Sequence, residues 1–265
     1  MFEQTLRILS YNLQVGIQTT RKAHYITGGW KHLLPHPQRF KNLDKLTPLL
    51  RGYDIVGLQE TDAGSLRSNH INLTEYLATH AGFTHWHHQV NRNFANIAKH
   101  SNGLLSKVKP YAVEDIRLPG LVPGRQAMLA KYKYGEETFA VIILHLALSK
   151  GARMKQLIAV SKIVNEFSHA VVMGDFNCKT ESNEMKYLFN NTHLREPIEN
   201  CNTFPSWRPQ HHIDHVLVTS KIDVVKIEAV QHVCSDHLPL MIEIKLPEKL
   251  DKNKPAVLQE EVEDA

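Results

Sequence analysis

Residues 171–177 read VVMGDFN, an apolar run that ends in an aspartate, Asp175, with an asparagine, Asn177, two positions later. A buried carboxylate is costly to remove from water unless a partner or a metal ion compensates its charge. An apolar strand that ends in Asp175 therefore indicates that polar groups from elsewhere in the chain meet this aspartate where the strand leaves the core.

Seven further apolar or β-branched runs are typical of buried strands. They are LRILSYNL (6–13), DIVGLQE (54–60), NGLLSKV (102–108), AMLAKY (127–132), FAVIILHLAL (139–148), HIDHVLVT (212–219) and PLMIEIKL (239–246). Apolar residues at helical spacing predict helices at 40–50, 73–81 and 152–167. Because strands and helices alternate throughout, we predict an α/β (α+β) fold with one continuous core.

Polar residues stand at particular ends of these runs. Asn12 comes late in the first run and Glu60 ends the second, whereas Asp214 and the segment 235–237 (SDH) stand at the start of the last two runs. Strands that run in opposite directions present opposite ends to the same edge of a sheet. If the last two strands oppose the earlier ones, all these residues meet at one rim.

Four acids fall on this predicted rim: Glu60, Asp175, Asp214 and Asp236. Four unpaired carboxylates cannot share one site at neutral pH, and oxygen-rich sites favour a hard cation such as Mg²⁺ or Mn²⁺. His145, inside the apolar run 139–148, and His237 are then candidates for proton transfer or phosphate contact. The combination predicts metal-assisted attack of water on a phosphoester.

Composition narrows the class of protein. No apolar run approaches the roughly 20 residues of a transmembrane helix, and the N-terminus has no apolar segment followed by a cleavage site, so we expect a cytoplasmic protein without a membrane span. The three cysteines, Cys178, Cys201 and Cys234, are widely spaced and odd in number, which argues against a disulfide framework. Cys178 directly follows the site, and we interpret it as a small buried thiol rather than a nucleophile.

Apolar patterning stops after Leu246, so we expect one domain over residues 1–246 and a charged, disordered tail over 247–265. The tail has six acids and three lysines and therefore a net charge of −3. Because the whole chain has a net charge of +4, residues 1–246 carry +7. This excess suits an anionic substrate. Two stretches without clear periodicity, 16–39 and 85–102, are interpreted as long loops.

Six segments resemble, in order and approximate separation, the motifs of the endonuclease/exonuclease/phosphatase superfamily: SYNL (10–13), LQE (58–60), HLAL (145–148), MGDFN (173–177), IDHVLV (213–218) and SDHLPL (235–240). The superfamily includes deoxyribonucleases, abasic-site endonucleases, neutral sphingomyelinases and inositol polyphosphate 5-phosphatases. The resemblance spans residues 6–246. It implies a deoxyribonuclease I-like two-layer β-sandwich flanked by helices, with the site at one end of the sheets.

The resemblance also implies residue roles. Glu60 is expected to be the main ligand of Mg²⁺ or Mn²⁺, with Asn12 beside it and Asp236 as a further ligand. Asp175 is expected to orient or deprotonate the attacking water, and Asn177 to bind the phosphate. At position 14 this sequence has glutamine, where abasic-site endonucleases usually have an aspartate. A neutral amide binds Mg²⁺ less tightly than a carboxylate, so the motif leaves open whether one or two metal ions bind.

The later motifs complete the implied site. Asp214 is expected to pair with His237, which contacts the scissile phosphate, while His145 lies over the leaving group or the phosphate. Arg125 and Asn102, in the segments 124–132 and 101–107 that also resemble the family, are expected to contact the substrate phosphate.

The substrate remains open at this level. A phosphodiesterase or nuclease that acts as a monomer on an anionic phosphoester, with nucleic acid as a partner, is favoured by the basic charge and by basic, amide-rich loops. An intracellular lipid phosphodiesterase is the alternative, because Trp30, Leu33 and Leu34 could form an apolar loop. An inositol phosphatase ranks lower, and a non-catalytic binding protein should lack a rim residue, whereas none is missing.

Overall fold

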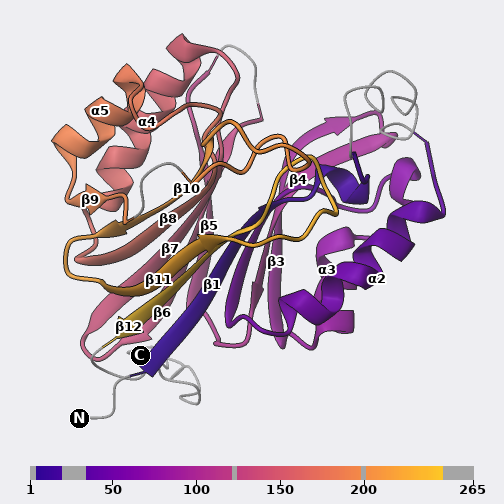
Figure 1. Ribbon diagram of the computed structural model, residues 1–265, viewed down its shortest axis with the longest axis horizontal. Helices are drawn as coiled ribbons and strands as arrows, with labels where there is room; N and C mark the ends of the chain where they lie inside the picture. The colour runs from indigo at the N-terminus through magenta and orange to yellow at the C-terminus, as the bar shows by residue number, and fades with distance from the viewer. Residues whose placement is uncertain (1–3, 20–33, 121–123, 198–200, 247–265) are drawn as a thin grey trace, which may run out of the picture.

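The structure, a computed structural model, describes residues 4–19, 34–120, 124–197 and 201–246 (Figure 1). Its main elements are two six-stranded sheets. The first has the order β11 (Asp223–Ala229), β12 (Leu240–Leu246), β1 (Gln4–Asn12), β2 (Ile55–Asp62), β4 (Ala98–Ser106) and β3 (His85–Phe94). The second has the order β5 (Ala112–Arg117), β6 (Gln126–Tyr134), β7 (Glu137–His145), β8 (His169–Asp175), β10 (Asp214–Thr219) and β9 (Leu194–Arg195).

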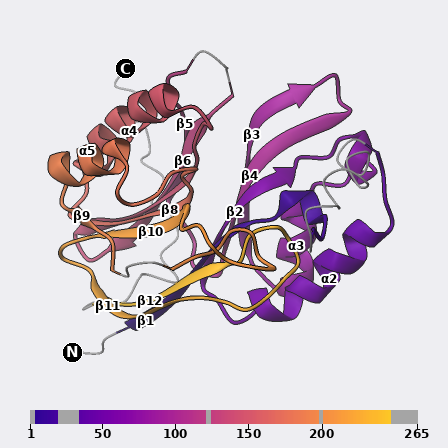
Figure 2. The same ribbon diagram turned by 45° about the horizontal axis from the view of Figure 1, so that its top comes forward.

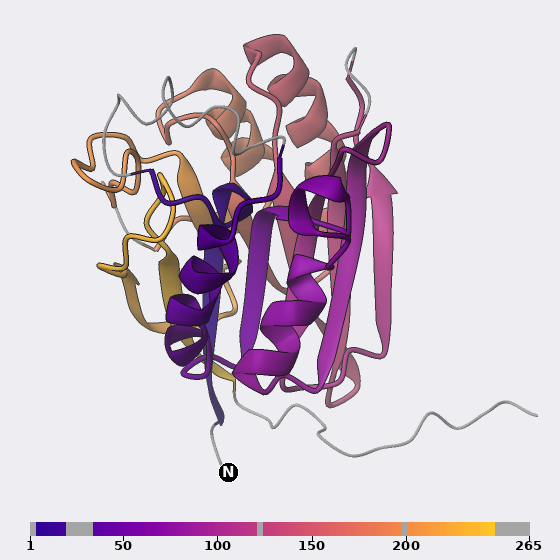
Figure 3. The ribbon, with the colours of Figure 1, turned by 90° about the vertical axis from the view of Figure 1, so that its right-hand side faces the viewer.

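Helices cover the outer face of each sheet, as Figure 2 shows. α2 (Gln38–Leu50) and α3 (Leu73–Ala81) lie on the first sheet, in front of it in Figure 3, while α4 (Lys150–Val164) and α5 (Asn183–Asn191) lie on the second. One apolar cluster fills the space between the sheets, and one lies under each helix pair. The predicted two-layer β-sandwich flanked by helices is confirmed.

The central strands of the second sheet explain the apolar runs. β7 and β8 are parallel neighbours, and every residue of β8 is buried. Alternate residues of β8 pack between the sheets, as Val171 does, or under α4 and α5, as Val172 does. A strand covered on both faces has a continuous apolar sequence rather than an alternating one.

The strand directions bring the polar ends together. β10 runs antiparallel to β8, with Asp214 opposite Asp175, and β12 runs antiparallel to β1, with Ser10 opposite Leu240. The late strands therefore begin where the earlier strands end, which meets the condition under which the sequence placed these residues at one rim. Short 3₁₀ turns at Gln14–Gly16 and Leu66–Ser68 follow β1 and β2 on the same side.

The prediction of a loop over residues 85–102 is wrong, because this stretch forms β3 and the first half of β4. β3 is an edge strand in which only Gln89 is buried, so its sequence lacks the apolar run of a covered strand. Backbone pairing from His85 opposite Ser106 to Phe94 opposite Ala98 holds the hairpin. The exposed strands β5 and β11, the short β9 and helix α5 escaped prediction in the same way.

Some predictions concern residues outside the described part of the chain. They are the tail at 247–265 and, within the predicted loop 16–39, residues 20–33, which include Trp30 and Leu33. Among the described residues, no helix has both the length and the apolar character needed to cross a bilayer.

Gly174, which precedes Asp175, is required by the close approach of β7. Its φ is +143°, and a Cβ added there would lie 1.9 Å from the backbone oxygen of Leu144. We expect Gly174→Ala to lower the free energy of unfolding by at least about 3 kcal/mol, because both the backbone conformation and the contact become strained. Urea unfolding followed by circular dichroism measures this loss.

The matched control is Gly151→Ala in α4, where a Cβ would meet no atom within 4 Å. It should unfold at the wild-type urea midpoint or slightly above, because alanine favours a helix over glycine. Equal midpoints for the two variants would contradict the requirement for glycine at position 174.

Candidate active site

Six segments bring polar side chains to the common edge of the two sheets. The predicted site residues that lie at this edge and are at most 8% exposed are Asn12, His145, Asp175, Asp214, Asp236 and His237. Glu60 joins them from β2, with a side chain 33% exposed. Strands position most of these groups, so the sheet framework holds them with little freedom.

Asp175 is the hub of the site. Its Oδ2 accepts a hydrogen bond from Asn12 Nδ2 at 3.1 Å, and it lies 3.6 Å from His145 Nε2 and 4.0 Å from His237 Nε2. Its Oδ1 accepts from the backbone N–H of Asn177 at 2.9 Å. Four of the predicted site residues are thus within direct reach of one carboxylate.

Asp214 and His237 form the predicted pair. His237 Nδ1 lies 2.7 Å from Asp214 Oδ2, and the same oxygen accepts a hydrogen bond from the hydroxyl of Thr203. With Nδ1 engaged, His237 directs Nε2 towards Asp175. Thr203 was not predicted, since it lies in a segment without strand or helix periodicity, and no local signal marks it.

The protonation states follow from burial and charge. Burial opposes a charged ring at His237, but the charge and hydrogen bond of Asp214 outweigh it and raise the pKa of His237 to about 10. Burial, with the charges of Asp214 and Glu60, raises the pKa of Asp175 to about 7. Burial and the charge of Arg125 hold the pKa of His145 well below its ordinary value, so this ring is neutral.

The raised pKa of His237 predicts a pH-dependent stability. The charged ring stabilises the fold fully below pH 6.5, and this contribution is lost as the pH rises towards about 10. In metal-free protein, the stability of wild type relative to His237→Gln should therefore decline across this range. Urea unfolding at several pH values measures the difference, and a constant difference would contradict the raised pKa.

Glu60 reaches the site through an irregularity in β2. The pairing with β4 shifts register between Leu58 and Thr61, and Glu60 has a left-handed φ of +53°. Such a conformation is strained for a residue with a Cβ and is typical of functional positions. Asn177, with φ of +54°, is a second case, and its Nδ2 donates to the carbonyl of Leu146 at 3.0 Å.

A buried ionic network supports the strand beyond Glu60. Asp62 is fully buried and accepts from the backbone N–H of Ser65 at 2.7 Å and from Arg67 Nε at 2.5 Å. Arg39 from α2 donates to the carbonyl of Val15 at 2.8 Å and to that of Arg67. These bonds tie the segment after β2 to the turn after β1, beside Asn12.

A cavity of about 810 Å³ opens next to these groups. Glu60, His145 and Arg125 line it, together with His100 from β4. The outer wall is formed by the β3–β4 hairpin, with Arg92 and Phe94, and by the N-terminal part of α4. Arg125 thus lines the cavity, and its phosphate contact stays a prediction, while Arg92 and Phe94 of the unpredicted hairpin complete the wall.

Asn102 and Cys178 take positions away from the cavity. Asn102 is fully buried, and its Nδ2 donates to Gln89 Oε1 at 3.3 Å; Gln89 in turn donates to the carbonyl of Ala127 in the other sheet. The phosphate contact of Asn102 thus stays a prediction. Cys178 is buried, which raises its pKa to about 11, so its thiolate is scarce.

The donor set fits a hard divalent cation. Burial and then the charge of Asp236 raise the pKa of Glu60, so these two carboxylates repel each other. Asn12 adds an amide beside them and bonds to Asp175. Asp175, Asp214 and His237 also place potential ligand atoms within 4.8 Å of one another. Clustered oxygen donors that repel one another are what a bound cation stabilises.

Comparison with known proteins agrees with this geometry. Residues 9–237 match the family model described as Endonuclease/Exonuclease/phosphatase family. A search of curated proteins gave no match.

Solved structures are similar in fold at low sequence identity. An endonuclease/exonuclease/phosphatase family protein from Bacteroides thetaiotaomicron is 16% identical with a TM-score of 0.71, over 93% of this chain and 99% of that chain. A mannosyl-6-phosphatase from Bacteroides thetaiotaomicron is 15% identical with a TM-score of 0.70, over 90% and 99%. The human Nocturnin catalytic domain with bound sulfate is 15% identical with a TM-score of 0.68, over 91% and 94%.

These likenesses establish the fold, and the family model covers most of the chain together with the residues that surround Asp175. The chain belongs to the endonuclease/exonuclease/phosphatase family.

Proposed function

We propose that this protein is a metal-dependent phosphodiesterase that cleaves nucleic acid by attack of water on phosphorus. The observation that carries the proposal is the surroundings of Asp175. A carboxylate with a pKa raised to about 7 lies within 4.0 Å of the charged ring of His237, close to a cavity lined by Arg125. A base matched to neutral pH beside two cations suits an anionic phosphoester.

Each side chain of the site has a separate role in the proposed reaction. Asp175 accepts a proton from the attacking water, whose oxygen forms the new bond to phosphorus as the ester P–O bond breaks. His237, held by Asp214, and Arg125 face the negative charge that develops on the phosphate oxygens. His145 is neutral and close to Asp175, so it can orient the water or the leaving oxygen by hydrogen bonding.

Glu60, Asn12 and Asp236 would hold the metal ion, for which we propose Mg²⁺ or Mn²⁺ on the grounds of their oxygen donors. When bound, such an ion withdraws charge from the phosphate and favours attack at phosphorus. Asp175 and Asp214 then remain available for the proton transfer and for His237.

The cavity wall supports nucleic acid as substrate. The guanidinium of Arg92 lies 4.4 Å from the centre of the Phe94 ring, and Phe94 is 44% exposed. Lys155 of α4 adds another cation to the same cavity. Exposed aromatic rings beside cations are the combination that binds bases and phosphates of single-stranded nucleic acid. The lipid alternative depends on Trp30, Leu33 and Leu34, of which Leu34 is described and 48% exposed, whereas Trp30 and Leu33 lie outside the described residues.

A panel of substrates tests the proposal. Purified protein with Mg²⁺ or Mn²⁺ is given plasmid DNA, single-stranded RNA and DNA, an abasic-site duplex, sphingomyelin micelles, inositol phosphates and a sugar phosphate monoester. We expect metal-dependent cleavage of single-stranded nucleic acid that weakens steeply with salt. Turnover confined to sphingomyelin would overturn the nucleic-acid assignment and keep the phosphodiesterase reaction, whereas turnover confined to a monoester would overturn both.

Phe94→Ala sharpens the same experiment. Loss of one stacked base costs about 1–3 kcal/mol, so KM for single-stranded substrate should rise about tenfold or more. Val225→Ala, which removes an exposed apolar side chain on β11, is the matched control. Equal KM values for the two variants would exclude a stacking role for Phe94.

A further inference from the structure

A second cluster of ligand-type side chains lies on the other face of β10 from the active site. Successive residues of a strand point to opposite faces, so Asp214 faces the active site while His215 faces the helices α4 and α5. His215 contacts the ring of Phe176, which belongs to the apolar cluster under these helices. Its neighbours are Glu196, directly after β9, and His212, before β10.

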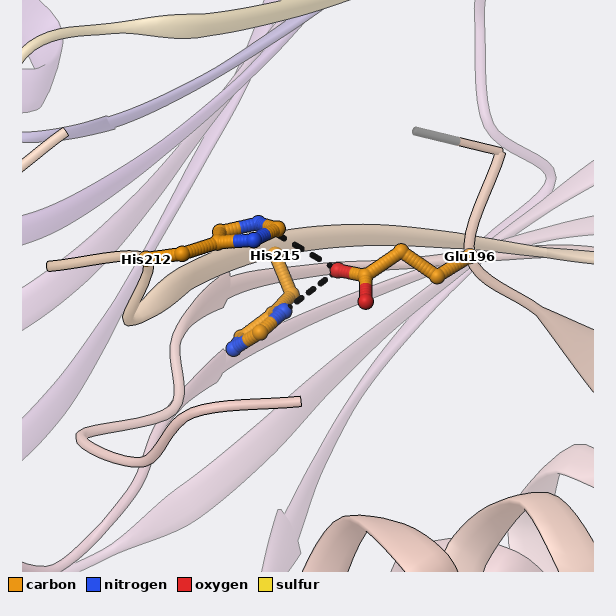
Figure 4. A group of neighbouring side chains, drawn as sticks. All are labelled: Glu196, His212 and His215. Carbon is orange, nitrogen blue, oxygen red and sulfur yellow. Dashed lines mark hydrogen bonds and ion pairs between the residues drawn. The ribbon is translucent and has the colours of Figure 1, made fainter. Parts of the chain in front are cut away.

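Figure 4 shows both histidine rings directed at one carboxylate. Glu196 Oε1 lies 2.6 Å from His215 Nδ1 and 3.3 Å from His212 Nε2. The two rings stack with centroids 4.5 Å apart. The side chain of His215 is fully buried, and those of His212 and Glu196 are each 7% exposed. Potential ligand atoms of the three residues lie within 4.8 Å of one another.

Neutral histidine rings cannot satisfy all the hydrogen-bonding groups of this cluster. His215 has an acceptor at each nitrogen, the carbonyl of Cys178 2.8 Å from Nε2 and Glu196 at Nδ1, whereas a neutral imidazole carries one N–H. His212 Nε2 is buried and makes no hydrogen bond among the described residues, because its approach to Glu196 lacks hydrogen-bond geometry. A cation bound between the three side chains would accept the lone pairs of His215 Nδ1 and His212 Nε2 and would compensate the charge of Glu196.

We propose that Glu196, His212 and His215 bind a divalent transition-metal ion, with Zn²⁺ the best match, at a structural site separate from the catalytic centre. Two imidazoles and one carboxylate are a zinc donor set that leaves the fourth tetrahedral position to water. Bonds of about 2.0–2.1 Å around a tetrahedral ion separate ligand atoms by roughly 3.3 Å. The His212–Glu196 spacing is 3.3 Å, and the His215–Glu196 contact must open by about 0.7 Å.

The surroundings resemble the outer shell of a metal site. Ligating histidines usually donate their second N–H to a carbonyl or carboxylate, as His215 Nε2 does to Cys178, and ligating carboxylates are themselves hydrogen-bonded. The second oxygen of Glu196 accepts from Thr180 Oγ1 at 2.7 Å. The ion would thus join the segment after Asp175 to the segments around β9 and β10, and would stabilise their arrangement without touching substrate.

Zinc titration of chelator-treated full-length protein tests the proposal, with binding followed by calorimetry and stability by thermal unfolding. All titrations are done in Glu60→Gln protein, which weakens the catalytic metal site. His212→Gln is the test variant, and His193→Gln, an exposed histidine near Glu196, is the matched control. We expect one zinc ion to bind the parent and the control, and binding at least 100-fold weaker in His212→Gln.

Thermal unfolding gives an independent result. Zinc at a hundredfold excess over Kd should raise Tm of the parent by roughly 5 °C, and should not raise that of His212→Gln. Equal zinc affinity in His212→Gln and the parent would overturn the proposal. So would a parent that binds no zinc, in which case a proton occupies the Glu196–His215 contact. If His212→Gln does not fold, Glu196→Gln replaces it, and zinc affinity equal to that of the parent in this variant would overturn the proposal in the same way.

Discussion

Asp175→Asn lowers kcat about 10³-fold and leaves the fold intact. The asparagine oxygen can accept only one of the two hydrogen bonds that Asn12 and the Asn177 N–H donate to Asp175. The amide cannot take a proton from water, and general bases contribute 10²–10⁴-fold. Because burial raises the pKa of Asp175, a neutral side chain here should not reduce stability. Steady-state kinetics on the best substrate of the panel, with urea unfolding alongside, measures both effects.

Asp223→Asn is the matched control, because Asp223 is an exposed carboxylate at the start of β11, outside the site. It should keep wild-type kinetics. If Asp175→Asn retained more than about a tenth of wild-type kcat, Asp175 would not be the base, and the assignment of the whole edge would need revision.

Asp214→Asn lowers kcat about 10²-fold or more, because His237 loses the charge that keeps it protonated and correctly oriented. His237→Ala should lower kcat at least as far. Residues that act as one unit are strongly non-additive, so the double variant should be no slower than His237→Ala alone. The measurement is a double-mutant cycle on kcat.

If the two reductions in kcat multiplied in the double variant, Asp214 and His237 would not act as a pair and would have separate roles. Thr203→Val gives a graded comparison, because it removes only the hydroxyl that donates to Asp214. Its effect should be smaller than that of Asp214→Asn and should disappear in the Asp214→Asn background.

Prediction from the sequence was accurate where local pattern and burial coincide. β8 is covered on both faces, so its apolar run and its ending in Asp175 were both visible, and the same holds for β1, β2 and β7. It failed at β3, where the edge strand has one buried residue, Gln89, and therefore no apolar period. The strand that brings Arg92 and Phe94 to the cavity wall was missed for the same reason.

The sequence by itself determined the α/β class, the central strands and the candidate site residues at their ends, because strand burial and strand termini leave a local signature. The two layers followed from the family resemblance. The tertiary structure decided which strands oppose one another, how Thr203 reaches Asp214, and that Glu196 meets His212 and His215 behind the active site. Those contacts join residues far apart in the chain, and packing of the sheets, rather than any local periodicity, sets their distances.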